Sequence, residues 1–236
     1  MGGEYKVIEM HNSDNMQNTI EKLLPKIKKT ILSIQKTNGI CSLALAGGNT
    51  PKSLYSALSD EDIDWSSINI TLTDERWVDV DHADSNENML RTCFASSNSE
   101  LNFISLKSSD SSVYSGEKIT NKILSEKIPS LDVVILGMGE DGHFASIFPS
   151  VENYDALMDL KNTSRCLAVA PENKQARLSL TFRYLLSASV IYLLISGKEK
   201  KELLDRELDL NEISSEFPIT ALLNQSRCPV NIYWNP

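Results

Sequence analysis

A histidine that a glycine-rich turn places after a strand is the feature of this sequence that most directly points to chemistry. Residues 133–136 form an aliphatic run without alternation, typical of a strand buried on both faces. Gly137, Gly139 and Gly142 follow and lead to His143, at the edge where open α/β sheets bind ligands. Imidazole titrates near neutral pH, so His143 is a candidate general acid and base. A histidine that only caps a helix is the plainer alternative.

A second glycine-rich segment joins an expected strand at residues 42–46 to a helix that begins near Pro51. Unpaired N–H groups at a helix N-terminus, together with the helix dipole, form an anion site. Gly47 and Gly48 allow close approach there, and the Thr50 hydroxyl can donate to a phosphate oxygen. The segment is neither a Walker loop nor a dinucleotide fingerprint. A tight turn with Thr50 as an ordinary N-cap is the alternative.

Charged residues follow other expected strands. Asp74 and Arg76 come directly after a strand at residues 68–73, and Arg177 and Lys198 each stand beside a further strand end. Arginine offers a planar fork for phosphate or carboxylate oxygens, and Asp74 can hold that arginine or a substrate hydroxyl. Solvated surface charges are the alternative for all four residues.

The elements that must position these residues are short apolar runs alternating with amphipathic ones. Further strands are expected at residues 5–8, 166–170, 190–195 and 230–234. Helices are expected at residues 15–36, where Pro25 predicts a kink or restart, and at 86–94, 113–126 and 198–208. Residues 74–85 are expected to be a polar loop, and residues 145–148 a tight turn or a first helical turn. The alternation predicts one α/β domain over residues 1–236, an open, largely parallel, Rossmann-like sheet with helices on both faces.

The composition narrows the possible partners. The chain has 41% hydrophobic residues, which is enough for a hydrophobic core. Its net charge of -9 disfavours nucleic acid or an anionic membrane as a binding partner. It carries four cysteines without paired spacing, which indicates free thiols in a reducing compartment: Cys41, Cys93, Cys166 and Cys228. The other two histidines, His11 and His82, are expected to be solvated, and no metal site is expected. Without a signal-peptide pattern or a long apolar segment, a cytoplasmic protein is expected.

Five segments occur in order between about residue 43 and residue 200: LALAGGNTPKSLY, TLTDERWVDVDHADSNENMLR, DVVILGMGEDGHFASIFP, RLSLTFRYLL and LLISGKEK. Together they resemble the 6-phosphogluconolactonase family, in the superfamily shared with glucosamine-6-phosphate isomerases and deaminases. The resemblance implies hydrolysis of 6-phospho-D-glucono-1,5-lactone, the second step of the oxidative pentose phosphate pathway. It also implies that no cofactor or metal is needed. The expected partner is therefore a small sugar-phosphate lactone, and a monomer or a homodimer is expected.

The resemblance also assigns roles to residues. His143 matches the family's catalytic base, and we expect it to take a proton from water and return it to the ring oxygen. Asp141 either orients the imidazole or only caps the turn, and a backbone N–H of residues 137–143 is a candidate oxyanion donor. The substrate loop of the family matches Gly47, Gly48 and Thr50, although Asn49 replaces the usual serine. Its D-E-R motif matches Asp74 and Arg76, and its phosphate-side cations match Arg177 and Lys198.

Two other functions remain as alternatives. An amino-sugar phosphate deaminase carries a glutamate just before the proline of this segment, where this chain has Phe148, and the loop that ends in S-Y in deaminases reads Ser85-Asn86 here. A non-catalytic sugar-phosphate sensor would join this fold to a DNA-binding helix-turn-helix. The residues before Ser42 hold only one expected strand and one expected helix, which disfavours the sensor.

Overall fold

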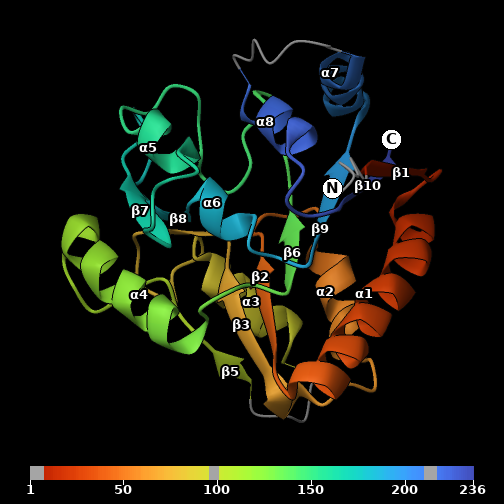
Figure 1. Ribbon diagram of the computed structural model, residues 1–236, viewed down its shortest axis with the longest axis horizontal. Coiled ribbons are helices and arrows are strands. Elements are labelled where there is room, and N and C mark those ends of the chain that lie inside the picture. The colour runs from red at the N-terminus through yellow and green to blue at the C-terminus, as the bar shows by residue number, and fades with distance from the viewer. Residues whose placement is uncertain (1–7, 96–100, 210–216) are drawn as a thin grey trace, which may run out of the picture.

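A parallel sheet of seven strands forms the centre of the molecule (Figure 1). The computed structural model describes residues 8–95, 101–209 and 217–236. The strand order is β1-β10-β9-β6-β2-β3-β5, with every neighbouring pair parallel. The strands are β1 (Ile8–Asn12), β2 (Cys41–Leu45), β3 (Ile68–Leu72), β5 (Asn102–Phe103), β6 (Val133–Leu136), β9 (Val190–Ser196) and β10 (Val230–Asn235). Every residue of β2 and β6 is buried, as their apolar sequences predicted.

The direction of the connections reverses between β2 and β6. From β2 the chain moves outward to β3 and β5, and it then returns to β6 on the other side of β2. Leu45 pairs with Ile135, so the two strands end at nearly the same level. Open α/β sheets bind ligands at such a switch point, beyond the carboxyl ends of the strands. In Figure 1, β6 and β9 run towards the part of the molecule where α7 and α8 lie.

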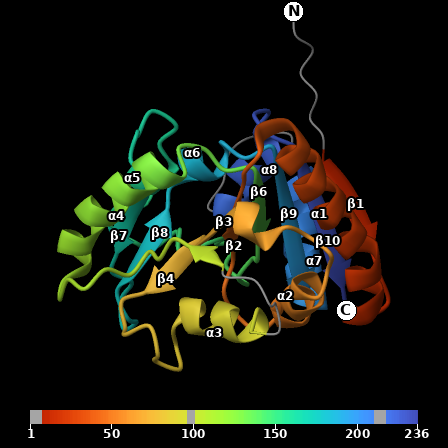
Figure 2. The same ribbon diagram turned by 90° about the horizontal axis from the view of Figure 1, so that it is seen from below.

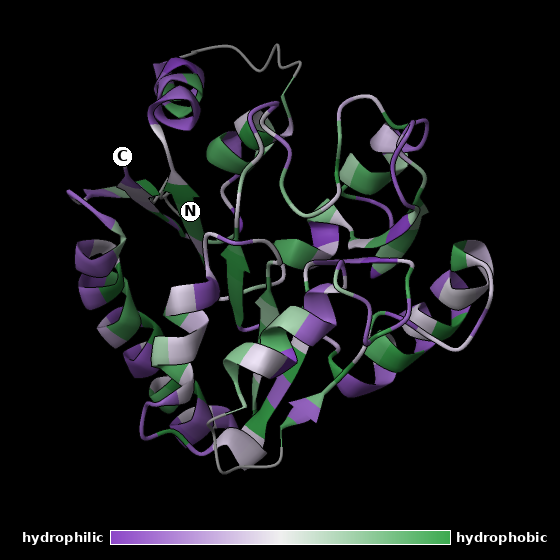
Figure 3. Cartoon of the chain, turned by 180° about the vertical axis from the view of Figure 1, so that it is seen from behind, coloured by the Kyte–Doolittle hydropathy of each residue, from purple (hydrophilic) through white to green (hydrophobic). Residues whose placement is uncertain are grey.

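Helices cover the sheet, and Figure 2 shows α1 and α4 at opposite sides of the molecule. The helices are α1 (Met16–Asn38), α2 (Lys52–Ser59), α3 (Asn86–Cys93), α4 (Val113–Lys127), α5 (Tyr154–Met158), α6 (Phe182–Leu185), α7 (Lys198–Asp209) and α8 (Pro218–Asn224). The Asn15 side chain caps α1, and the helix passes through Pro25 without restarting. Figure 3 shows apolar strands in the centre and polar residues mainly on the outer helices. The expected fold class is confirmed.

A second sheet of three antiparallel strands was not predicted. Its order is β4 (Asp74–Arg76), β8 (Arg177–Leu180) and β7 (Cys166–Val169). The expected polar loop is therefore wrong at residues 74–76, and the strand expected at 166–170 belongs to this sheet and not to the parallel one. Strand β4 contains no apolar run. Its strand conformation is instead stabilised by pairing with β8 and by a buried carboxylate.

That carboxylate belongs to Glu75, which is 1% exposed. It accepts the backbone N–H groups of Arg76, Asn86 and Glu87, each at 2.8 Å, and the Ser85 hydroxyl at 3.0 Å. Burial raises the pKa of Glu75, although these donors act in the opposite direction. The carboxylate satisfies N–H groups that the first turn of α3 would otherwise leave unpaired. It therefore fixes β4 against α3, and both elements reach the cavity described below.

Three local expectations have separate outcomes. Residues 5–7 of the expected first strand lie outside the described residues, and β1 continues to Asn12. Residues 145–146 form a turn and not a helix, which agrees with the tight turn expected as one alternative, and Ala145 has φ 49°. The expectation that His11 is solvated is wrong, because it lies on β1 and stacks on Tyr233 at 4.5 Å, whereas His82 is exposed. Within the described ranges, no helix has the length and apolar character needed to cross a membrane.

Candidate active site

A cavity of about 400 Å³ opens at the switch point, beyond the ends of β2 and β6. Its lining includes most of the residues predicted for the site: Gly47, Gly48, Thr50, Asp74, Arg76, His143 and Arg177. Asp141 lies behind His143, against the imidazole ring. Lys198 is exposed and does not belong to the lining. The fold thus brings segments from both sheets to one place.

The imidazole of His143 is oriented by Asp141. Nδ1 of the ring contacts Oδ1 of Asp141, and the same oxygen accepts the backbone N–H of His143 at 3.3 Å. Burial raises the pKa of Asp141, but the hydrogen bond from the ring and the charge of His143 outweigh it, so the pKa is lowered overall. An ionised carboxylate at Nδ1 favours the tautomer that is protonated there. Nε2 is then the basic nitrogen, on a ring that lines the cavity.

Packing leaves this pair little freedom. A Cβ at Gly139 would lie 2.2 Å from Cε1 of His143 and 2.7 Å from Oδ1 of Asp141, so a larger residue does not fit. Gly142 has φ +69°, which favours glycine. On another side, the buried ring of Phe148 lies 4.3 Å from the imidazole. The glycines of the turn are therefore needed to seat the Asp141–His143 pair.

The loop after β2 approaches the cavity with its backbone. A Cβ at Gly47 would lie 2.0 Å from Oδ1 of Asn86, and Gly48 has φ +92°. Asn86 donates from its amide to the carbonyl of Asp74 at 2.9 Å, which links this loop to β4. Pro51, and not Thr50, occupies the N-cap position of α2, so the N-cap alternative for Thr50 is wrong. Thr50 therefore lines the cavity without a capping role.

Arg177 is held by a buried polar group. The Ser146 hydroxyl donates to Oδ2 of Asp74 at 2.5 Å and accepts from Nη1 of Arg177 at 3.2 Å. Nη1 of Arg177 also lies 3.7 Å from Oδ2 of Asp74. Burial lowers the pKa of Arg177, while Asp74 opposes and Arg76 adds to that effect. Within the described part of the chain, Nε of Arg177 is buried without a hydrogen-bond partner.

Arg76 and Arg177 lie directly opposite each other in the antiparallel pair of β4 and β8. Like charges in such positions destabilise a sheet. Arg76 relieves part of this repulsion by donating from Nη1 to the carbonyl of Asp84 at 2.5 Å. Both arginines nevertheless line the cavity, so an anion bound there would offset their repulsion.

The third cation of the lining is Lys200, in place of Lys198. Residues two apart on a helix point to nearly opposite sides, so the two lysines cannot share a face. Lys200 lies in line with the buried residues Leu203, Leu204 and Glu207 of α7. Helical periodicity could have distinguished the two lysines, whereas the strand end alone could not.

Two further residues were missed. Asn86 is the first residue of α3 and follows the capping Ser85, so its type has an ordinary explanation at a helix start. Ser146 lies in an irregular turn and is fully buried. Nothing in the sequence around Ser146 signals its contact with Asp74.

The chain is similar to known proteins along most of its length. Residues 14–234 match the family described as Glucosamine-6-phosphate isomerases/6-phosphogluconolactonase. The chain belongs to this family. It is similar to the 6-phosphogluconolactonase of Pseudomonas putida, at 33% identity over 97% of this chain and 93% of that one. It is similar to that of Pseudomonas aeruginosa at 35% identity over 91% and 89%. The crystal structure of a 6-phosphogluconolactonase from Shewanella baltica OS155 superimposes with a TM-score of 0.91, at 32% identity, over 99% of this chain and 100% of that one.

Phe148 stands at the position where a deaminase is expected to carry a glutamate, so its surroundings bear on the choice between lactone hydrolysis and deamination. Its buried ring packs against the imidazole of His143, the ammonium of Lys174 at 5.0 Å and the guanidinium of Arg177 at 5.3 Å. Asp74 is the one carboxylate among the described residues that line the cavity. The carboxylate expected of a deaminase at this position is replaced by an apolar contact that supports the base and a cation.

Across residues 8–95, 101–209 and 217–236, no group of three or more His, Cys, Asp or Glu side chains is arranged to hold a metal ion. The roles of the predicted site residues, and a reaction without metal or cofactor, stay predictions.

Proposed function

We propose that this chain hydrolyses 6-phospho-D-glucono-1,5-lactone to 6-phospho-D-gluconate in the oxidative pentose phosphate pathway. The observation that carries the proposal is the position of His143, oriented by Asp141 in a cavity that Arg177 and Arg76 also line. A base and a cationic site in one cavity fit a substrate with a hydrolysable ester at one end and a phosphate at the other. The names of the similar proteins from both Pseudomonas species support the same reaction.

In the proposed mechanism, Nε2 of His143 takes a proton from a water molecule as the water oxygen attacks C1 of the lactone. The resulting imidazolium lies against the carboxylate of Asp141, which stabilises it. The tetrahedral intermediate then expels the ring oxygen, and the imidazolium returns its proton to that oxygen. Ring opening leaves a carboxylic acid, which ionises. Such acid–base work contributes about 10²–10⁴-fold to the rate.

The negative charge that develops on the carbonyl oxygen needs a donor. Within the turn, the N–H groups of Gly139, Gly142 and His143 already bond to oxygens of the turn itself. Gly137 and Met138 are the other residues of the turn that line the cavity. We therefore assign the oxyanion to this end of the turn, close to the base.

The phosphate is assigned to the cations that line the cavity. Arg177 and Arg76 offer guanidinium groups, and Lys200 approaches from α7. The loop that contains Gly48 and Thr50 adds backbone N–H groups and a hydroxyl. These groups give a positive wall to a chain whose net charge is -9, and a phosphate dianion complements it.

The remaining expectations are part of the proposal. One domain over residues 1–236 is supported by a buried core that includes residues of both sheets. A cytoplasmic location is supported by four free cysteines, of which Cys41 and Cys228 have pKa values raised by burial to about 12 and about 11. We also propose a monomer or a homodimer that binds neither nucleic acid nor membrane.

The test is acid release from freshly made 6-phosphogluconolactone, corrected for spontaneous opening, beside ammonia release from glucosamine 6-phosphate. We expect saturable acid release, no ammonia release and no loss of rate after exhaustive chelation. Ammonia release as the faster reaction would establish the deaminase alternative. Tight binding of 6-phosphogluconate without turnover of the lactone would establish the sensor.

A further inference from the structure

The turn that carries His143 rests on the first turn of α8. The backbone N–H of Ile219 donates to the carbonyl of Gly142 at 3.0 Å. A Cβ at Gly142 would lie 3.0 Å from Cβ of Phe217 and 3.1 Å from Cγ2 of Ile219, so the two backbones are in close contact. Any movement of α8 is therefore transmitted to the residue directly before His143.

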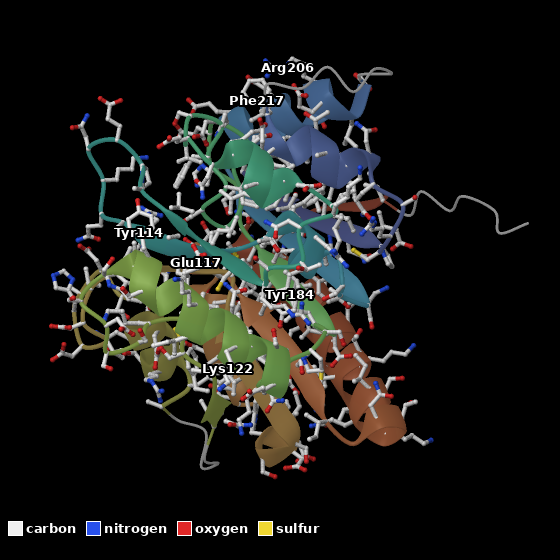
Figure 4. All side chains as sticks on the ribbon, turned by 60° about the vertical axis from the view of Figure 1, so that its left-hand side comes forward. Tyr114, Glu117, Lys122, Tyr184, Arg206 and Phe217 are labelled. Carbon is white, nitrogen blue, oxygen red and sulfur yellow. The ribbon has the colours of Figure 1, made fainter. Side chains whose placement is uncertain are left out.

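A buried hydrogen bond fixes α8 to α7. The Thr220 hydroxyl donates to Oε2 of Glu207 at 2.5 Å, and the two residues are 0% and 2% exposed. The second oxygen of Glu207 accepts from Nε of Arg206 at 3.1 Å. The guanidinium of Arg206 in turn lies 5.2 Å from the ring centre of Phe217, and Figure 4 shows these two side chains together at the top of the molecule.

The carboxylate of Glu207 is buried, and it is paired with Arg206 and hydrogen-bonded to Thr220. Burying a charge is unfavourable unless it is paired and hydrogen-bonded, and apolar pairs of similar volume often hold two elements equally well. A directional bond between Glu207 and Thr220 does what an apolar contact does not: it selects one register of the two helices. The register matters here because α7 also carries Lys200, two helical turns before Glu207 on the same face.

We propose that Glu207 is a positioning residue, which through Thr220 sets α8 and the His143 turn relative to Lys200. This inference rests on the proposed function for its kinetic consequence, but its structural part does not. The pair touches no substrate; it holds the base and the cation at the spacing that one bound lactone requires.

Three variants test this role. Thr220→Val removes the hydroxyl with little change in shape, and Thr220→Ser retains it. Glu207→Met combined with Thr220→Val removes both polar partners, so that no buried charge is left unpaired. The matched control is Thr120→Val on α4, a threonine 1% exposed whose hydroxyl donates to the carbonyl of Leu106 at 3.0 Å, away from the cavity.

Two quantities are measured for each variant at a temperature where it is folded: kcat for the phosphorylated lactone and hydrogen exchange of the Ile219 amide. We expect Thr220→Val and the double variant to lower kcat about 5- to 20-fold, because small misplacements of reacting groups are costly. Exchange of Ile219 should accelerate in both. Thr220→Ser should restore both quantities, and Thr120→Val should leave both within about twofold of the parent, within the usual effect of a distant substitution.

Equal losses of kcat in Thr220→Val and Thr120→Val would overturn the proposal, since a general loss of stability would explain both. Parental kcat and Ile219 exchange in the double variant would overturn it as well. A parent protein without lactonase activity would refute the proposed function alone, because Ile219 exchange still reports whether the pair holds the turn.

Discussion

The two sheets of this protein contribute opposite properties to one cavity. The central strands β2 and β6 of the parallel sheet are buried, and their ends supply the glycine-rich loop and the His143 turn. The antiparallel sheet carries charge and places Arg76 opposite Arg177 at a cost in stability. The base thus follows a strand of the parallel sheet, and the two arginines stand on a small sheet that an anion would stabilise. Reaction chemistry and charge recognition should therefore be separable by substitution.

The largest loss of activity is expected from a substitution of His143, which follows a strand of the parallel sheet. His143→Asn should fold and bind 6-phosphogluconate normally, yet lose about two or more orders of magnitude in kcat, because no group replaces the base. The measurement is acid release under saturating substrate, with product binding by calorimetry as the control for folding. A variant within a fewfold of the parent would show that His143 is not the base.

The next largest loss of activity is expected from a substitution of Arg177, which lies on β8 of the antiparallel sheet. Arg177→Met should lower kcat/KM for the phosphorylated lactone about 10- to 150-fold, since a hydrogen bond to a charged group contributes about 1.5–3 kcal/mol. Arg183→Met is the matched control, because Nη1 of Arg183 donates to the carbonyls of Lys161 and Asn162 outside the cavity. Similar losses in both variants would mean that the effect of Arg177 is not one of substrate recognition.

A smaller effect concerns the support of the base. Asp141→Asn should reduce kcat by about tenfold, less than His143→Asn, because it disturbs the orientation of the ring and leaves the ring in place. The pKa of Asp141 is lowered in the folded protein, so its stabilisation is present above its ordinary value of 3.8 and is lost as the pH falls through the lowered value. The difference in Tm between parent and variant should therefore shrink below pH 3.8. A difference that stays constant or grows below pH 3.8 would contradict the stabilisation by the ionised carboxylate of Asp141.

The smallest effect distinguishes two neighbouring lysines of α7. Lys200→Met should raise KM for the phosphorylated lactone a fewfold, whereas Lys198→Met should leave it unchanged, because only Lys200 lines the cavity. Steady-state kinetics at low ionic strength measure both. The opposite ranking would restore Lys198, the residue that the strand end alone predicted.

The sequence predicted the first sheet far better than the second, for a physical reason. Strands β2 and β6 are buried on both faces, so all their residues except Ser42 are apolar and the signal is local. Strand β4 is Asp74, Glu75 and Arg76, whose strand conformation depends on pairing with β8 and on partners from α3. Such partners are distant in sequence, and no local pattern records them.

The same distinction applies to the site. His143 could be found because the glycines that seat it are its sequence neighbours. Ser146 could not be found, because its role depends on Asp74 and Arg177, which reach it only through the second sheet. The choice between Lys198 and Lys200 depends on the rotation of α7, which its buried leucines record.

The most direct test of this division is one set of four rate ratios. Acid release is measured for His143→Asn and Arg177→Met, each with 6-phosphogluconolactone and with unphosphorylated gluconolactone, and each kcat/KM is divided by that of the parent. We expect His143→Asn to lower kcat/KM for both lactones by the same factor. Arg177→Met should lower kcat/KM for the phosphorylated lactone at least tenfold more than kcat/KM for the unphosphorylated one, a change in selectivity of about 1.4 kcal/mol. Equal losses for both lactones in Arg177→Met would place that arginine at the reacting centre and contradict the separation of the two sheets.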